Sequence, residues 1–596
     1  SDGYLQGDGP ITVNGIFDFA HGKVFGNGSF TVSGTMELTG SSTRTLVGRT
    51  ITNNGSIINT GTGTLRMQDN AQIINTAGAI FDLQSDANID YLDPSGGKIF
   101  NYGNFQKSVG SGSTQIDVEL INEGSITVNS GTVKLTRGGN VTACSNTIAA
   151  GSRLVLDDED FLLSNVTFGG SGIIEFSTNS VTVSSGGVTI LSPATLEFPG
   201  GTVKGSGDLT IEGTFDWSRG ALSGSGDVIV NGLLKITGSN YKELIERTLI
   251  NNTTTIWSDG DIKLKDQAKI INQSGSLFDV KTDNLMDYVL ADNGGSFVNL
   301  GQLKKTAGSG TATIDPIFHN TGTVEVLSGT LRFERGSASS SSTGHFLTHS
   351  GTTLVLSERS FIIDGAYFEG AGITQVTDAI LEVTGTGLQM SADATIKLDD
   401  PDGKIQGTGP LTINGRLEWL QGTINGSGNF VINNTLVLGG SHFKELTGRT
   451  ITNNGTTIAT GSGSLRFSNS AVFDNTSGAV FEFQADAPFV KVLPDGGTFN
   501  NHGILRKLNG SGDSQLGIDL VNYGAIEVQG GATLSIASGG RLLFPQGTVT
   551  GAGILNIQGS MLWSGGTVAG NGQLTNHGLI ELSGSGLKTL DTRTLV

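Results

Sequence analysis

The chain has 596 residues, 92 glycines, one cysteine and a net charge of −19, from 35 Lys and Arg against 54 Asp and Glu. This acidic balance disfavours a nucleic-acid binder, because phosphates would be repelled, and a lone thiol excludes an internal disulfide framework. No run of about 18 apolar residues occurs, so no membrane insertion is expected.

A long tandem repeat organises the chain. The stretch 15–19 returns at 213–217, 415–419 and 559–563, and an Arg-Thr-Ile or Arg-Thr-Leu marker keeps the same spacings of 198, 202 and 144 residues. The repeat predicts that residues 1–14 are the tail of a preceding unit and that a fourth unit starts at 559–596. The three units between them are 15–212, 213–414 and 415–558.

Each unit contains a finer period. The pattern Asn-x-Gly-x-apolar occurs at Asn53, Asn101 and Asn122, with a variant at Asn75, which gives steps of 22, 26 and 21 residues. Alternating runs such as 30–32 and 209–211 indicate strands. Asn and Gly between such runs indicate turn residues that tolerate positive φ.

Strands and turns at roughly 20–25 residues per coil predict an all-β chain that folds as a single elongated β-solenoid, a parallel β-helix of about 25–30 coils. The Phe19, Trp217, Trp419 and Trp563 position is expected to point inward. A string of β-sandwiches is the weaker alternative. The third unit is 54 and 58 residues shorter than the first and second, with the loss between Ala537 and Phe544, and a solenoid tolerates loss of whole coils.

No capping segment is recognised at either end of the chain. We therefore expect either a piece of a longer array or a subunit that self-associates end to end through unpaired strand edges.

Repeated cations are the first candidate sites. Spaced anion or glycan sites are predicted at Arg44, Arg49, Lys242, Arg247, Lys444, Arg449, Lys588 and Arg593. A further base recurs at Lys107, Lys305 and Lys507, each before a Gly-Ser-Gly turn. The competing structural interpretation is that these cations pair between adjacent coils or cap turns.

Repeated acids are the second candidates. Candidate calcium ligands are Asp82, Asp86, Asp279, Asp283, Glu482 and Asp486, and no other cofactor is expected. Further acids cluster at 157–160 and 399–402, where an acidic turn is the simpler interpretation. Of the seven histidines only His345 and His349 are near neighbours, without a His-Glu-x-x-His pattern, so the chain is not expected to be an enzyme.

Over essentially its whole length, the Asn-x-Gly-x-Ile and Gly-x-Ile-x-Gly-x-Gly coils resemble those of bacterial secreted β-helix proteins of the filamentous-haemagglutinin and autotransporter-passenger type. The resemblance implies an extracellular or cell-surface location and an adhesive or structural role. The expected partners are further copies of the chain and surface glycans or other cells. We expect a non-enzymatic structural or adhesive fibre, stalk or matrix component. The alternative is a β-helix protein that binds or cleaves extracellular polysaccharide.

Overall fold

The computed structural model describes residues 3–92, 95–493, 495–508 and 512–596. The chain is 56% strand and 1% helix and forms a parallel β-solenoid of about 28 turns, which confirms the predicted fold class and coil number. It divides into two compact units, Ser1–Gly301 and Gln302–Val596, each described below by itself. The boundary between them falls inside the second repeat unit rather than between repeats.

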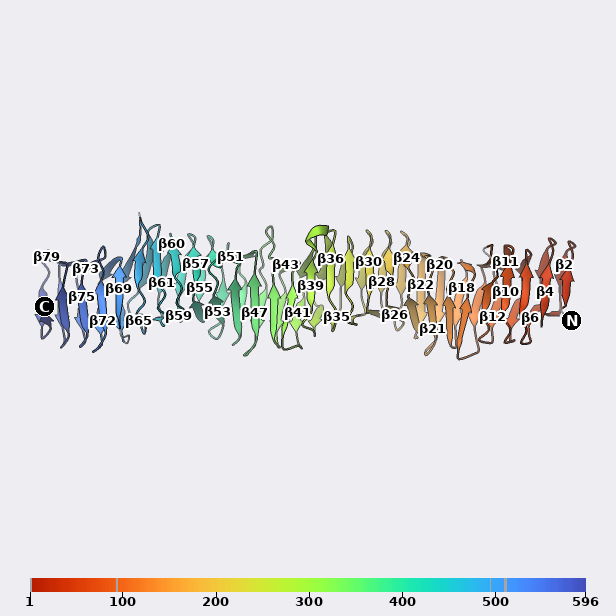
Figure 1. The fold of residues 1–596 in the computed structure, drawn as a ribbon, viewed down its shortest axis with the longest axis horizontal. Helices are drawn as coiled ribbons and strands as arrows, with labels where there is room; N and C mark the ends of the chain where they lie inside the picture. Colours follow the sequence, from red (N-terminus) through yellow and green to blue (C-terminus); the bar gives the residue numbers. More distant parts are fainter. Residues whose placement is uncertain (1–2, 93–94, 494, 509–511) are drawn as a thin grey trace. The chain divides into compact units, whose positions relative to one another are not determined.

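A coil consists of three short strands joined by tight turns. The first coil of the N-terminal unit contains β1 (Tyr4–Gln6), β2 (Ile11–Val13) and β3 (Ile16–Asp18). The next coil, with β4 (Gly22–Phe25), β5 (Phe30–Val32) and β6 (Thr35–Leu38), lies on it strand for strand in parallel register. Stacking of successive coils gives three faces, and strands of neighbouring coils run side by side (Figure 1).

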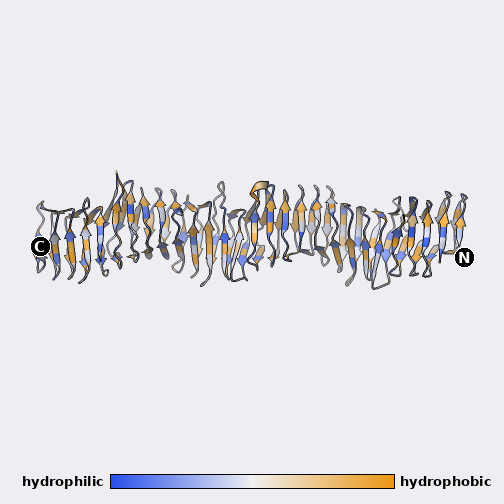
Figure 2. Ribbon diagram, in the orientation of Figure 1, coloured by the Kyte–Doolittle hydropathy of each residue, from blue (hydrophilic) through white to orange (hydrophobic). Residues whose placement is uncertain are grey.

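Alternating side chains fill the interior of each coil. In β9 (Ser56–Asn59) the second and fourth residues are buried and the first and third are partly exposed, and Figure 2 shows this alternation of apolar and polar residues along many strands. Trp217 and Trp419 are 1% and 0% exposed, and Phe19 and Trp563 are also buried, so the predicted inward aromatic position is confirmed. The indole N–H groups of Trp217 and Trp419 donate to the Gly220 and Gly422 carbonyls at 3.3 and 3.2 Å.

Two long strands connect neighbouring faces of the N-terminal unit. β20 (Gly139–Ile148) pairs with both β17 (Glu119–Asn122) and β18 (Ser125–Val128), and β22 (Phe161–Gly170) lies on β20. Ala143 and Asn165 take φ of 52° and 54° where these strands bend. A left-handed residue turns the chain here without ending the strand.

The asparagines of the Asn-x-Gly motif form buried ladders. Asn53 Nδ2 donates to Asn75 Oδ1 at 2.7 Å, Asn75 to Asn101 at 2.7 Å and Asn101 to Asn122 at 2.6 Å, and all four side chains are fully buried. Equivalent ladders join Asn251, Asn272 and Asn299 in the same unit, and Asn453, Asn475, Asn501 and Asn522 in the C-terminal unit. The amide side chains therefore satisfy one another from coil to coil.

The tolerance of Asn and Gly for positive φ is not used at this motif. Asn53, Asn101 and Asn122 are not among the residues with positive φ, and neither are Gly55 and Gly124 of the same motifs. A Cβ on Gly55 or Gly124 would instead lie 2.2 or 2.1 Å from a carbonyl oxygen of the coil before it. Glycine is required because the backbones of stacked coils approach closely at this turn.

Successive repeats are out of phase with the three faces. In the first repeat β7 (Arg44–Val47) pairs with β4 and with β10 (Leu65–Gln68), on the first face. Its counterpart β33 (Lys242–Ile245) pairs with β30 (Gly220–Ser223) and β36 (Ile262–Lys265), on the second face. The second face is continuous from β5 to β30, because each strand pairs with the next. Between these two it consists, in order, of β8 (Thr50–Asn53), β11 (Ala71–Asn75), β14 (Gly97–Asn101), β17, β20, β22, β24 (Ser180–Val183) and β27 (Thr202–Lys204). A repeat of 198 residues is therefore not a whole number of turns.

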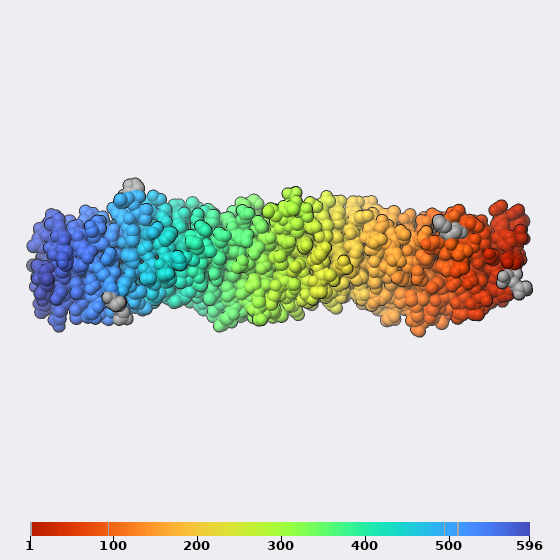
Figure 3. Space-filling model, in the orientation of Figure 1, coloured from red at the N-terminus to blue at the C-terminus, as the bar shows by residue number. Residues whose placement is uncertain are grey.

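The C-terminal unit follows the same plan. β70 (Asp519–Asn522), β73 (Arg541–Phe544) and β76 (Ser560–Trp563) pair in parallel register, so stacking continues across the place where the third repeat is shortened. Within each unit the coils follow in sequence order, and the colours of the space-filling view change without mixing (Figure 3). Among the described residues the helical element is a single 3-10 turn, η1 (Leu290–Asp292), in the N-terminal unit.

We expect Asn75→Ala to destabilise the coils around β11 and β14. The substitution removes the donor to Asn101 Oδ1 and to the Asn104 carbonyl, and one of the two acceptors of Asn53 Nδ2, which keeps its bond to the Ile80 carbonyl. Each buried group that stays unpaired costs about 1–3 kcal/mol. Hydrogen exchange of the β11 and β14 amides, followed by mass spectrometry, measures the effect. Asn54→Ala, at the exposed neighbouring position, is the control, and equal exchange in the two variants would contradict the ladder's role.

Candidate functional site

Arg49 ties three coils together from the inside. It lies in the corner between β7 and β8 and is 1% exposed. Its Nη1 donates to the carbonyls of Phe25, at 3.2 Å, and Gly7, at 3.1 Å, and its Nη2 donates to that of Gly9 at 3.1 Å. Phe25 belongs to the preceding coil, and Gly7 and Gly9 to the coil before that.

The same contact recurs in every repeat. Arg247 donates to the carbonyls of Gly226 and Gly207, Arg449 to those of Asn425 and Gly409, and Arg593 to those of Ala569 and Gly553. We call Arg49, Arg247, Arg449 and Arg593 the arginine staples. Burial lowers the pKa of Arg449 to about 10 and lowers those of Arg247 and Arg593, because the guanidinium is removed from water without a carboxylate in direct contact.

A second set of cations caps the turn before each staple. Lys444 Nζ donates to the carbonyls of Gly439, His442 and Leu420 at 2.6, 2.9 and 3.2 Å, and Lys242 donates to those of Gly238 and Asp259. Arg44 occupies this place in the first repeat and donates to the Thr39 and Gly63 carbonyls. Lys588, which is partly exposed, donates to the carbonyls of Gly584 and Gly586 in the fourth.

These positions correct the anion-site prediction. Seven of its eight residues, Arg44, Arg49, Lys242, Arg247, Lys444, Arg449 and Arg593, are at most 4% exposed. Their donor groups face main-chain oxygens, so an external glycan or anion does not reach them. The competing interpretation, that the repeated cations cap turns, is confirmed for this set.

A third set of cations joins adjacent coils through carboxylates. Lys107 Nζ, fully buried, lies 2.7 Å from Asp86 Oδ1, and Lys507 lies 2.7 Å from Asp486 Oδ1. The hydrogen bond from the lysine is the largest cause that lowers the pKa of Asp86 and of Asp486 below the ordinary range. Asp86 and Asp486 also accept from the Gly112 and Gly512 amides, so each carboxylate closes a turn.

The other predicted calcium ligands also have partners. Asp82 accepts hydrogen bonds from Gln84 and Ser108, Asp279 pairs with Lys281, Glu482 accepts from Gln484, and Asp283 has a partner of its own. Within the part of the chain that the structure describes, no three of these six carboxylates lie within reach of one ion. The prediction of repeated calcium sites is therefore not supported by the geometry.

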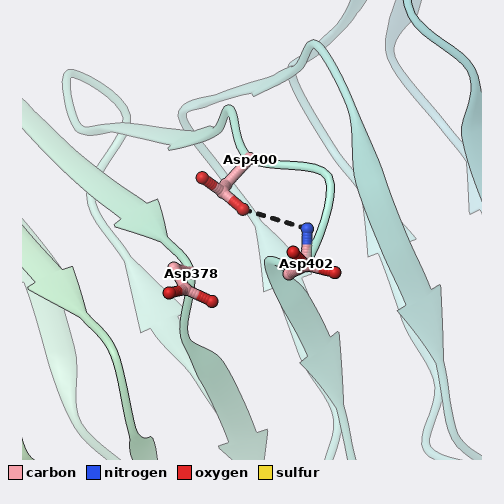
Figure 4. A group of neighbouring side chains, drawn as sticks. All are labelled: Asp378, Asp400 and Asp402. Atoms are coloured by element: carbon pink, nitrogen blue, oxygen red, sulfur yellow. Dashed lines mark hydrogen bonds between the residues drawn. The ribbon is translucent and has the colours of Figure 1, made fainter.

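One acidic group does gather three carboxylates. Asp378, before β51 (Ile380–Val383), lies beside Asp400 and Asp402 in the turn before β54 (Lys404–Gln406), with oxygens within 4.8 Å of one another (Figure 4). Asp402 N donates to Asp400 Oδ1 at 2.9 Å, which agrees with the acidic-turn interpretation. Asp378 and Asp402 are exposed, and the group offers part of the six to eight oxygens that calcium takes.

A groove lies at the corner between the first and second faces of the N-terminal unit. Its volume is about 530 Å³, and its lining comes from four successive coils, at residues 177–179, 199–202, 219–221, Tyr241 and Glu243. A smaller groove of about 420 Å³ in the first repeat includes His21 and Thr43, which stand 198 residues before Arg219 and Tyr241. Because the repeats are out of phase with the faces, the two grooves occupy different corners.

Tyr241 is the exposed aromatic of the larger groove. The residue is 54% exposed, and Lys263 Nζ lies 4.1 Å from the ring centroid. Phe443, at the same repeat position, is covered in the same way by Arg466 at 3.9 Å. The sequence signal for this pair is the shared repeat position of Tyr241 and Phe443. The cations come from the following coil, where Lys263 and Arg466 occupy the same register position.

Comparison with protein-family models, with curated proteins and with solved structures finds no match for this chain. The described residues include no helix with both the length and the apolar character needed to cross a membrane. The geometry of the chain itself is therefore the basis for a functional proposal.

The buried lysines predict a measurable dependence of stability on pH. Burial lowers the pKa of Lys444 from 10.5 to about 8, so the folded chain releases this proton at lower pH than the unfolded chain. The difference in free energy of unfolding, wild type minus Lys444→Met, is therefore lowest below pH 8. It rises by up to about 3 kcal/mol as the pH increases from 8 towards 10.5.

Urea denaturation of both proteins at a series of pH values measures this difference. A difference that stays constant from pH 7 to 10.5 would contradict the lowered pKa of Lys444. Burial also lowers the pKa of Lys242 to about 8. Lys242 is therefore expected to give the same trend in the N-terminal unit.

Proposed function

We propose that this chain is a non-enzymatic structural and adhesive component of an extracellular surface or matrix, as a fibre, stalk or matrix element. The arginine staples carry the proposal. Each staple bonds its own coil to the two coils before it, and the contact recurs at Arg49, Arg247, Arg449 and Arg593. A contact kept in every repeat serves the whole solenoid, whereas a catalytic centre needs one place only.

The direction of these contacts suits a load-bearing role. Parallel strands of neighbouring coils are joined mainly by main-chain hydrogen bonds and side-chain stacking, with the asparagine ladders in addition. A staple adds charge-assisted hydrogen bonds, about twice as strong as neutral ones, across two successive coil interfaces. Separating the coils therefore requires these bonds to break together with the strand pairing.

The distribution of charge supports an adhesive surface on a constant interior. Ten of the 35 lysines and arginines are buried, so the exterior is more acidic than the net charge of −19 indicates. The buried residues repeat from unit to unit, but the corner residues differ, as His21 and Arg219 do at equivalent places. Such a scaffold can present different surfaces without changing its coils.

Removal of one staple is expected to weaken the coils mechanically. Arg449→Met leaves the carbonyls of Asn425 and Gly409 without this donor, at a cost of about 1–3 kcal/mol for each carbonyl that stays unpaired. Force spectroscopy on the full chain, pulled from its two ends, should show a lower unfolding force for coils of the C-terminal unit. Arg416→Met, at an exposed arginine paired with Glu418, is the control. Equal forces in both variants would contradict the load-bearing role.

The proposal includes end-to-end association of copies, since a parallel stack leaves unpaired strand edges wherever it stops. Electron microscopy of the concentrated protein is expected to show ordered filaments. Single particles at all concentrations would contradict this part of the proposal. Release of reducing or unsaturated sugar ends from extracellular polysaccharides would contradict the non-enzymatic part and favour the polysaccharide-cleaving alternative.

A further inference from the structure

The groove at residues 177–243 holds polar groups without partners in the chain. Among the described residues, the Arg219 guanidinium forms no ion pair, and the side chains of Asn179 and Thr202 form no hydrogen bond. Glu243, the acid in the lining, is paired with Lys265 at 2.8 Å. The groove therefore offers one uncompensated cation and neutral hydrogen-bonding groups to a ligand.

Tyr241 forms a wall of this groove. Gly220 lies opposite Lys242 on the preceding coil, so Arg219 and Tyr241 occupy the same register on adjacent coils. Lys263 belongs to the following coil, and its Nζ lies 4.1 Å from the centroid of the Tyr241 ring. This cation–π contact holds the ring, and Arg219 stands beside Tyr241 on the preceding coil.

We propose that this groove binds an extended polysaccharide that carries carboxylates, with a sugar ring on Tyr241 and a uronate carboxylate on Arg219. The inference rests on the proposed adhesive role and names its ligand class. An aromatic ring offers an apolar face to the C–H side of a pyranose, and a planar guanidinium matches a carboxylate with two parallel hydrogen bonds. Asn179 and Thr202 supply a donor amide and hydroxyl for the sugar hydroxyls.

The dimensions of the groove suit a linear chain. The lining comes from four coils, and coils are about 4.8 Å apart, so the groove extends about 14 Å along the stack. A pyranose ring spans about the same distance as one coil, so neighbouring sugars would face neighbouring coils. The recognition is local, because the exterior as a whole is acidic and does not attract polyanions at long range.

The third repeat provides a natural comparison. Phe443 and Arg466 reproduce the aromatic and its covering cation, but Gln421 stands where Arg219 does. Asp402 stands where Gly200 does, within the group of three aspartates. This corner has the aromatic without the free cation and with added negative charge, and it is not expected to bind a uronate.

Isothermal titration calorimetry of the full chain tests the proposal with three probes. These are a short oligomer of galacturonic acid, the uncharged galactose oligomer of the same length and a sulfated galactose oligomer. The galacturonate oligomer is expected to bind most tightly. Arg219→Ala should weaken it about tenfold or more and abolish the preference over the uncharged oligomer, and Tyr241→Ala should weaken both.

Phe443→Ala, the matched control, should leave the affinity unchanged. Binding of galacturonate that survives both Arg219→Ala and Tyr241→Ala would overturn this site while leaving the adhesive role in place. Absence of binding to every probe would overturn the saccharide site, whereas the load-bearing role is decided separately by the force measurements. A stronger response to the sulfated oligomer would overturn the assignment of a carboxylate.

Discussion

The need to satisfy polar groups inside a narrow stack of coils governs this structure. Each coil buries main-chain carbonyls at its corners, where strand pairing is interrupted, and an unpaired buried group costs about 1–3 kcal/mol. Side chains that extend towards neighbouring coils supply hydrogen bonds to these groups. Asparagine ladders satisfy one another, and buried arginines and lysines donate to carbonyls of their own coil and of the coils before it.

This constraint explains the composition better than surface chemistry does. Glycine is abundant partly because a Cβ at Gly55 or Gly124 would overlap the preceding coil, and conformational freedom is not the reason at these two positions. Repeated cations serve the interior, so an acidic exterior coexists with a chain of 35 lysines and arginines. The burial of a guanidinium is costly, and the bonds that it makes across three coils offset that cost.

The repeats, the coil length and the inward aromatics could be predicted because each leaves a periodic trace in the sequence. The roles of Arg49 and Lys444 could not, since an exposed anion site and a buried turn cap give the same spacing. The offset between the repeats and the three faces could not be predicted either, because it depends on how β20 and β22 bend around their corners. The corner groove depends on Arg219 and Tyr241 meeting across coils, which periodicity alone does not specify.

The mismatch between the repeat and the faces has a consequence for binding. If a repeat were a whole number of turns, equivalent corners would form a row on one side, and a ligand would meet identical sites in line. In the N-terminal unit the equivalent corners at His21 and Arg219 lie on different sides instead. Each corner can therefore diverge without disturbing a row, while the staples and ladders beneath it stay the same. This separation of a constant interior from variable corners is what allows one solenoid to combine strength with selective contact.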